Sequence, residues 1–224
     1  MGSAHRKVRV AFCGASGTGK TTLAKVIGKQ LGLPMNPHGS RTTAKKLGFQ
    51  SPYDVDRASL KWYQALIKEG HTPEMAAAEA MDDYASHGGE NCRSIFQREL
   101  QRCKIDWEQG QADSGDGFVV DRTTIDDFCY ASMHSPGTLD TAFLNAAKNH
   151  LALYDMVFYT PVSAFINLDG DSARVSDMGY HRAFDMFVQG VLDRWYPDYE
   201  TIRYGTLTKR IRFVMSRVES IPYE

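Results

Sequence analysis

The chain has 224 residues, of which 42% are hydrophobic and 24% charged, a composition typical of a soluble globular protein with one well-filled core. No run of about 18 apolar residues is present, so a membrane-spanning helix is not predicted. The formal net charge of −1 argues against an overall basic field for nucleic acid, although it leaves a local basic groove open.

The first predicted elements are a strand at residues 7–14 and a helix at residues 20–31, and the P-loop pattern G-x-x-x-x-G-K-[ST] lies between them. Its glycines let successive backbone N–H groups curl around phosphate oxygens, and the helix directs the positive end of its dipole at the same anion. We expect the Lys20 ammonium to be solvated and to reach the β- and γ-phosphates, and the Thr21 hydroxyl to suit Mg²⁺. The predicted nucleotide-binding residues of this stretch are Gly14, Ser16, Gly17, Thr18, Gly19, Lys20, Thr21 and Thr22.

The next part of the chain is predicted to be mainly helical. Residues 33–36 indicate a short second strand, and a turn at residues 37–41 opens a helix near Thr42. Further helices are predicted at residues 54–69, 72–86 and 91–109. Because residues 42–110 contain several helical patterns and no clear strand, we interpret them as a helical insertion within a single domain that spans residues 1–224.

The second half alternates strands with helices. The predicted elements are a strand at 118–121, a helix from Thr123 or Thr124 to about Met133, a helix at 139–153, a strand at 156–159, an irregular polar segment at 163–177, a helix through Trp195, a strand at 201–204 and a final helix ending near Val218. The strands are apolar without alternation, which indicates an α/β fold with a parallel sheet covered on both faces.

Asp121 is the second candidate for chemistry because it ends a buried strand. Beside a P-loop, such a carboxylate could hold Mg²⁺ through water or take a proton from an attacking hydroxyl. The alternatives are a helix N-cap or an ion pair with Arg122, and the P-loop favours the functional interpretation. Asp126 and Asp127 lie in the first turn of the next helix, where they could complement its dipole or face the site.

Three arginines are candidates for binding phosphate or substrate. Arg41 follows the short second strand, where an open α/β sheet places its substrate crevice, and could clamp a phosphate or stack on a base. Arg174 and Arg182 belong to residues 163–182, a predicted lid, and phosphoryl transfer needs positive charge and exclusion of water there. The alternatives are a surface arginine for Arg41 and a solvated loop for the lid.

The cysteines and histidines indicate no metal site. None of Cys13, Cys92, Cys103 and Cys129 forms a C-x-x-C pair, so we interpret them as small buried hydrophobes in a reduced, cytoplasmic setting. The histidines share no ligand spacing, and we assign them no metal role.

Taken together, residues 7–219 resemble the P-loop kinase superfamily. Val120 to Thr123 resembles the motif of an acidic residue, Arg and Ser or Thr in its nucleoside-kinase branch, which includes ribosylnicotinamide kinases and related phage ATP-binding proteins. Tyr154 to Tyr159, followed by Asp169-Gly170 and by Arg174 to Asp177, is similar to the strand and lid signature of that branch. Gly205 to Arg210 resembles its turn under the adenine.

The resemblance implies a three-layer sandwich around a five-stranded parallel sheet of order 2-3-1-4-5, with ATP and Mg²⁺ as cofactors. It assigns Lys20 and Thr21 to phosphate and Mg²⁺, Asp121 to base or Mg²⁺ handling, and Arg174 to the lid. It also implies that Gly205 contacts the nucleotide and that Arg122 and Gln97 bind substrate, Gln97 as a base-reading glutamine. Many members carry a carboxylate just after the second strand; here residues 38–41 hold none, which moves the predicted base to Asp121.

The leading hypothesis is a kinase that transfers the γ-phosphate of ATP to a hydroxyl of a nucleoside or nucleotide. A sharper alternative is a phage-type kinase that acts on 5-hydroxymethyluracil within DNA, and a second class is a regulatory ATP- or GTP-binding module. The DNA alternative requires a positive track along the backbone, for which the candidates are Arg41, Lys45, Lys46, Arg57, Lys61, Arg93, Arg98, Arg102 and Lys104. The acceptor and the oligomeric state stay open at this point.

Overall fold

The computed structural model describes residues 8–49, 52, 68–70, 72, 92–134, 140–163, 177–203 and 205–221. Its helices and strands alternate in the second half of the chain, as the sequence predicts. In chain order the described elements are β1 (Arg9–Cys13), α1 (Lys20–Leu31), α2 (Ser40–Lys46), α5 (Cys92–Asp113), β2 (Phe118–Asp121), α6 (Thr124–His134), α7 (Thr141–His150), the 3₁₀ turn η2 (Leu151–Leu153), β3 (Met156–Tyr159), α8 (Met178–Trp195), β4 (Glu200–Thr201) and α9 (Leu207–Glu219).

The described strands form a parallel sheet in the order β2-β1-β3-β4. Val10 of β1 lies opposite Val119 of β2, and Phe12 lies opposite Phe158 of β3. Every strand therefore ends at the same edge of the sheet, which carries the loop after β1. The P-loop at the end of β1 and the carboxylate at the end of β2 are neighbours for this reason.

The predicted second strand is reduced to one isolated parallel bridge between Met35 and Val119. Counting this bridge, the order of segments along the sheet is the predicted 2-3-1-4-5, but the sheet of the described residues has four strands where five were predicted. The bridge rests on two hydrogen bonds, from the Asn36 amide to the Val119 carbonyl and from the Val119 amide to the Pro34 carbonyl. The ladder is not extended in one direction because Pro34 has no N–H group, and in the other direction the next amide, that of His38, donates to Asn36 Oδ1 instead.

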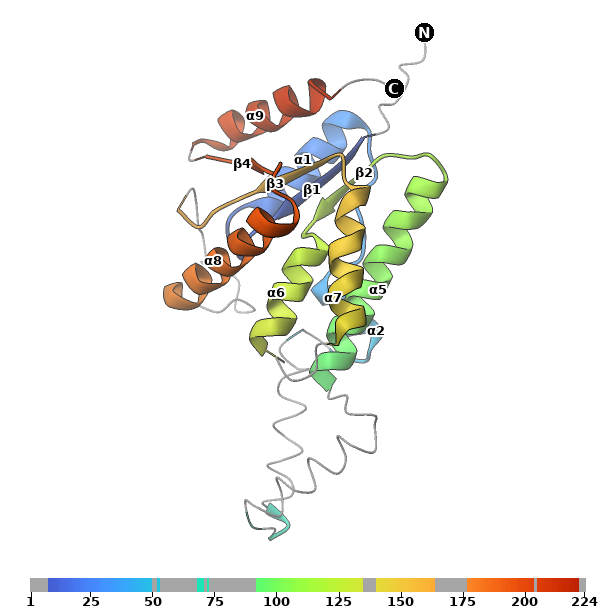
Figure 1. Ribbon diagram of the computed structural model, residues 1–224, viewed down its shortest axis with the longest axis vertical. Coiled ribbons are helices and arrows are strands. Elements are labelled where there is room, and N and C mark those ends of the chain that lie inside the picture. Colours follow the sequence, from blue (N-terminus) through green and yellow to red (C-terminus); the bar gives the residue numbers. More distant parts are fainter. Residues whose placement is uncertain are drawn as a thin grey trace.

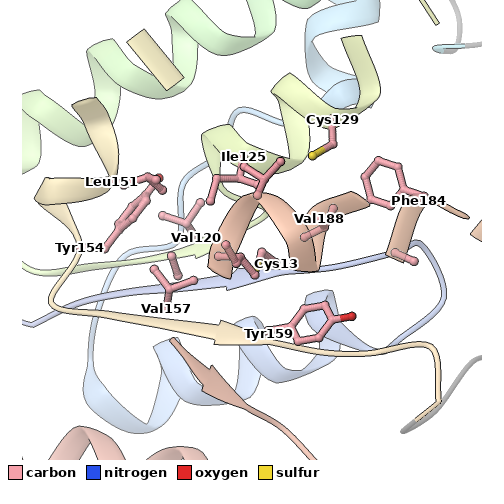
Figure 2. Close-up of a cluster of buried hydrophobic side chains, with 14 of the residues drawn as sticks. Cys13, Val120, Ile125, Cys129, Leu151, Tyr154, Val157, Tyr159, Phe184 and Val188 are labelled. Atoms are coloured by element: carbon pink, nitrogen blue, oxygen red, sulfur yellow. The ribbon is translucent and has the colours of Figure 1, made fainter. Parts of the chain in front are cut away.

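The sheet is buried on both faces, because alternate residues of β1 enter different clusters. Ala11 and Cys13 belong to the cluster formed with α6 and α8, and Val10 and Phe12 to the one formed with α1 and α9. Figure 1 shows α1 and α9 over one face and α5, α6, α7 and α8 over the other. Figure 2 shows side chains of the first cluster between the strands and two of the covering helices. The result is the predicted three-layer α/β sandwich.

The observed bounds differ modestly from the predicted ones. α5 continues to Asp113 rather than ending near 109, the predicted helix 139–153 consists of α7 and η2, and β4 occupies Glu200–Thr201 rather than 201–204. The predicted helices at 54–69 and 72–86, and most of the predicted insertion and lid, lie outside the described residues. Among the described helices, none combines the length and apolar character that crossing a membrane requires.

Candidate active site

The loop between β1 and α1 has the backbone conformation that its glycines allow. Gly14, Gly17 and Gly19 have φ angles of 124°, 81° and 85°, values that are favourable for glycine and strained for other residues. A Cβ atom at Gly14 would lie 2.5 Å from the Thr160 carbonyl oxygen, so this position also lacks space for a side chain. The loop therefore passes close to the end of β3 before α1 begins at Lys20.

Lys20 is buried rather than solvated, which corrects the sequence-based expectation. Only 4% of the residue is exposed, and its ammonium donates to the Ala15 carbonyl and to Thr18 Oγ1 within the same loop. Burial of the ammonium, followed by repulsion from Arg122, lowers the Lys20 pKa from 10.5 to about 8. An anion bound in the loop would relieve both effects.

Thr21 and Asp121 meet across the gap between α1 and β2. Thr21 Oγ1 donates to Asp121 Oδ2 at 2.5 Å, and Asp121 Oδ1 is buried without a hydrogen-bond partner among the described residues. The amide of Thr123 donates to Asp126 rather than to Asp121, so the capping alternative for Asp121 receives no support there. Asp121 therefore presents one oxygen to Thr21 and leaves the other available.

The same pair fits Mg²⁺ in its donor chemistry. A hydroxyl and a carboxylate are hard oxygen ligands, and protein sites for Mg²⁺ use few side chains together with water and substrate phosphates. Within the part of the chain that the structure describes, no three His, Cys, Asp or Glu side chains cluster as a denser metal site. Thr21 and Asp121 are thus a candidate site for nucleotide-bound Mg²⁺.

Arg122 extends from the same turn toward the P-loop. Its φ angle of 85° makes it the one non-glycine residue with positive φ in the described ranges. Its Nη2 donates to Ser16 Oγ at 2.7 Å, and its guanidinium lies over the Tyr130 ring at 5.0 Å from the centroid. Nη1 is buried and makes no hydrogen bond among the described residues, and it forms an ion pair with Asp126 Oδ1 at 3.7 Å. Arg122 therefore places a guanidinium nitrogen that makes no hydrogen bond beside the phosphate-binding loop, next to the Asp126 carboxylate.

Both aspartates that the sequence left open are buried. Asp126 Oδ1 accepts the Gly14 amide at 3.0 Å, and Oδ2 accepts the amide and hydroxyl of Thr123 at 2.8 and 3.0 Å. Asp127 forms an ion pair with Lys104 of α5, with 2.8 Å between the ammonium and Oδ2. Asp126 thus ties the P-loop to the start of α6, a role that its position in the first turn of a helix does not indicate.

The remaining candidates occupy different places. Gln97 on α5 is 5% exposed, and its Oε1 has no hydrogen-bond partner among the described residues. Arg41 is the second residue of α2 and Arg182 lies near the start of α8, and both are exposed. Thr22 is exposed in the first turn of α1. Arg174 lies outside the described residues.

Arg210 lies closer to the P-loop than the sequence motifs indicated. It is 5% exposed on α9, and its Nη2 donates to the Thr18 carbonyl at 2.8 Å. A pocket of about 130 Å³ adjoins it. The residues lining this pocket are Ile202, Arg203, Lys209, Arg210 and Phe213. Gly205 is in the connection between β4 and α9, so the turn that resembled an adenine-binding segment lies next to a pocket at the P-loop.

Comparison with known proteins gives one family and a set of similar folds. A family model described as an AAA domain matches residues 9–210. The structure of deoxyadenosine kinase from M. mycoides with the products dCMP and dCDP has a TM-score of 0.56 and 17% identity, covering 96% of this chain and 100% of that chain. The same enzyme with bound dATP has a TM-score of 0.53 and 16% identity, covering 95% and 100%.

A third similar structure is NadR in complex with NR, with a TM-score of 0.51 and 14% identity. The match covers 98% of this chain but only 53% of the NadR chain. The sequence comparison with curated proteins gives no match. At these identities the structural similarity establishes the fold, which is the α/β fold of P-loop kinases.

Proposed function

Because the chain belongs to the AAA domain family and has the fold of P-loop kinases, we propose that it transfers the γ-phosphate of ATP to a hydroxyl of a nucleoside or nucleotide. The observation that carries this proposal is the available Asp121 Oδ1, with Oδ2 held by Thr21 at the P-loop. A purely structural carboxylate would have both oxygens satisfied. A deoxyadenosine kinase is among the proteins that share the fold.

The P-loop would hold the phosphates of ATP. Its amides and the N-terminus of α1 face the anion, and the Lys20 ammonium would exchange the Ala15 carbonyl for phosphate oxygens. Arg122 Nη1, which is ion-paired with Asp126 at 3.7 Å but makes no hydrogen bond among the described residues, would supply a further donor. Beyond Thr18, the pocket beside Arg210 suits the base or sugar of the nucleotide, with Gly205 in the adjoining turn.

Asp121 would receive the proton that the acceptor loses. The acceptor oxygen forms a bond to the γ-phosphorus, the bond between that phosphorus and the bridging oxygen breaks, and ADP leaves with the electron pair. The hydroxyl proton passes to Asp121 Oδ1, while Thr21 fixes the orientation of the carboxylate through Oδ2. Mg²⁺ held by Thr21 and Asp121 would supply charge neutralisation of the β- and γ-phosphates.

On the acceptor side, Gln97 is the residue with the clearest support. Its buried Oε1 lacks a partner among the described residues, and an acceptor base offering N–H groups would satisfy it. Arg41, Arg174 and Arg182 stay predictions as further substrate contacts. Residues 163–182 stay our proposed lid on a single domain.

A free nucleoside or nucleotide is a better acceptor than DNA, because several residues of the predicted positive track are already paired. Lys46 and Arg102 contact Glu99, Arg98 contacts Asp140, and Lys104 is buried against Asp127. Arg57, Lys61 and the side chain of Arg93 lie outside the described part of the chain. Arg41 and Lys45 are exposed on α2.

The test is incubation with γ-labelled ATP, Mg²⁺ and a panel of nucleosides, nucleotides, plain DNA and hydroxymethylated DNA. We expect label on a free nucleoside or nucleotide, and for a nucleoside little dependence on salt. Transfer only to hydroxymethylated DNA, with affinity falling about 0.7–0.9 log units per log unit of salt for each phosphate contact, would establish the DNA alternative instead. Slow hydrolysis of ATP without any acceptor would indicate a regulatory module.

A further inference from the structure

Lys104 is a buried cation whose contacts reach the active-site turn. Only 1% of the residue is exposed. Its ammonium donates to Asp127 Oδ1 and Oδ2 at 2.9 and 2.8 Å and to the Arg122 carbonyl at 3.2 Å. The three donors of the ammonium therefore match three acceptors, one of which is a main-chain atom of the turn after β2.

The backbone of Arg122 is held from both sides in an unfavourable conformation. Its amide donates to the Phe12 carbonyl of β1 at 2.8 Å, and its carbonyl accepts from Lys104. With φ at 85°, this residue occupies the left-handed region, which side chains other than glycine rarely adopt unless the surroundings impose it. This conformation directs the guanidinium to Ser16 of the P-loop.

We propose that Lys104 is a positioning residue, which fixes the left-handed turn at Arg122 so that the guanidinium faces the phosphates of the bound nucleotide. The proposal rests on the proposed function only for the identity of that nucleotide as ATP. It adds a role for α5, the helix that follows residues 50–91 and carries Lys104.

The arrangement of α5 gives the proposal a second consequence. One face of this helix carries four buried polar residues at helical spacing, namely Gln97, Gln101, Lys104 and Glu108. Gln101 donates to the Phe143 carbonyl of α7, and Glu108 accepts from Asn36 and Tyr154. Gln97, two turns from Lys104, has an unsatisfied oxygen. A single rigid helix thus connects the proposed acceptor contact to the phosphate-side arginine, so displacement of α5 would affect both.

The test removes the contact while preserving the fold. The double variant Lys104→Met/Asp127→Leu replaces the buried ion pair with apolar side chains, a change that folded proteins often tolerate. Asp127→Asn alone keeps the Lys104 donor to the Arg122 carbonyl. We expect the double variant to bind ATP about tenfold more weakly by calorimetry, because the contact of the Arg122 guanidinium with the phosphates would lose its orientation. Asp127→Asn should bind ATP within about twofold of wild type.

The decisive comparison repeats the double variant in an Arg122→Ala background. If Lys104 acts through Arg122, the tenfold effect disappears there, because the guanidinium is already absent. Gln101→Met is the matched control, since it removes a buried polar contact of the same helix face and should leave the affinity for ATP unchanged. An effect that persists undiminished without Arg122, an Arg122→Ala variant with unchanged affinity, or a double variant that binds like wild type overturns the proposal. Calorimetry needs no acceptor, so these outcomes are separate from a failure of phosphoryl transfer.

Discussion

Raising the pH should weaken ATP binding because Lys20 loses its proton. The Lys20 ammonium is buried in the ligand-free P-loop, and its pKa is lowered to about 8. Bound phosphates stabilise the charged form, so ATP selects protein in which Lys20 is protonated. A group with a pKa of about 8 is about 90% protonated at pH 7 and about 3% protonated at pH 9.5. The apparent Kd for ATP should therefore rise about 30-fold over this interval.

The same shift fixes the sign of a stability effect in the ligand-free protein. The unfolded chain keeps the Lys20 proton up to about pH 10.5, whereas the folded chain releases it near pH 8. Because the unfolded state binds more protons between these values, the free energy of unfolding should rise with pH in this window, by up to about 3 kcal/mol from this group. Below pH 8 both states are protonated, and the contribution no longer changes.

The assay is calorimetric titration with ATP, together with chemical denaturation, on wild type and Lys20→Met from pH 7 to 10. Lys20→Met keeps a chain of similar length without a titrating group, so other lysines cancel in the comparison. The variant should bind ATP weakly with a flat profile between pH 7 and 9.5, and should exceed wild type in stability at pH 7. An equal pH dependence in both proteins, or no dependence in wild type, would refute the assignment to Lys20.

Three further substitutions separate the roles of neighbouring residues. Asp121→Asn should lower kcat at least about 100-fold while changing ATP affinity less, because the amide cannot accept the proton; unchanged kcat would return Asp121 to a structural role. Asp126→Asn should lower the free energy of unfolding by about 2 kcal/mol in urea titrations, because an amide group would face the Gly14 or Thr123 donors; a stability equal to wild type would contradict this. Gln97→Leu should raise KM for the acceptor without changing ATP affinity, and an unchanged acceptor KM would remove Gln97 from the site.

Residues close together in sequence account for most of what could be predicted. The P-loop pattern, with its apolar strand before and amphipathic helix after, predicted β1, the glycine turn and α1 because all their determinants are local. The resemblance supplied the order of the sheet. The predicted second strand is reduced to one bridge because Pro34 lacks the N–H group that would extend the ladder and the His38 amide donates to Asn36 Oδ1.

Contacts between distant residues account for what sequence reasoning missed. Asp126 accepts the amide of Gly14 from 112 positions away, and Arg210 donates to the Thr18 carbonyl from 192 positions away. At such separations along the chain, no short sequence motif contains both partners of either contact. Lys104 was predicted as a candidate for a positive track along DNA, but its face of α5 is buried against α6. Burial of a charged side chain can be inferred only when its ion-pair partner is identified, and for Lys104 this partner is Asp127.

Stoichiometry of the reaction products tests the central claim most directly. Wild-type protein would be incubated with ATP, Mg²⁺ and the nucleoside or nucleotide acceptor that the labelling panel selects, and ADP and phosphorylated acceptor would be quantified from the same samples. We predict equal amounts of both products, with both reduced together in Asp121→Asn. ADP formed without phosphorylated acceptor, in wild type and across the whole panel, would contradict the assignment of this protein as a kinase.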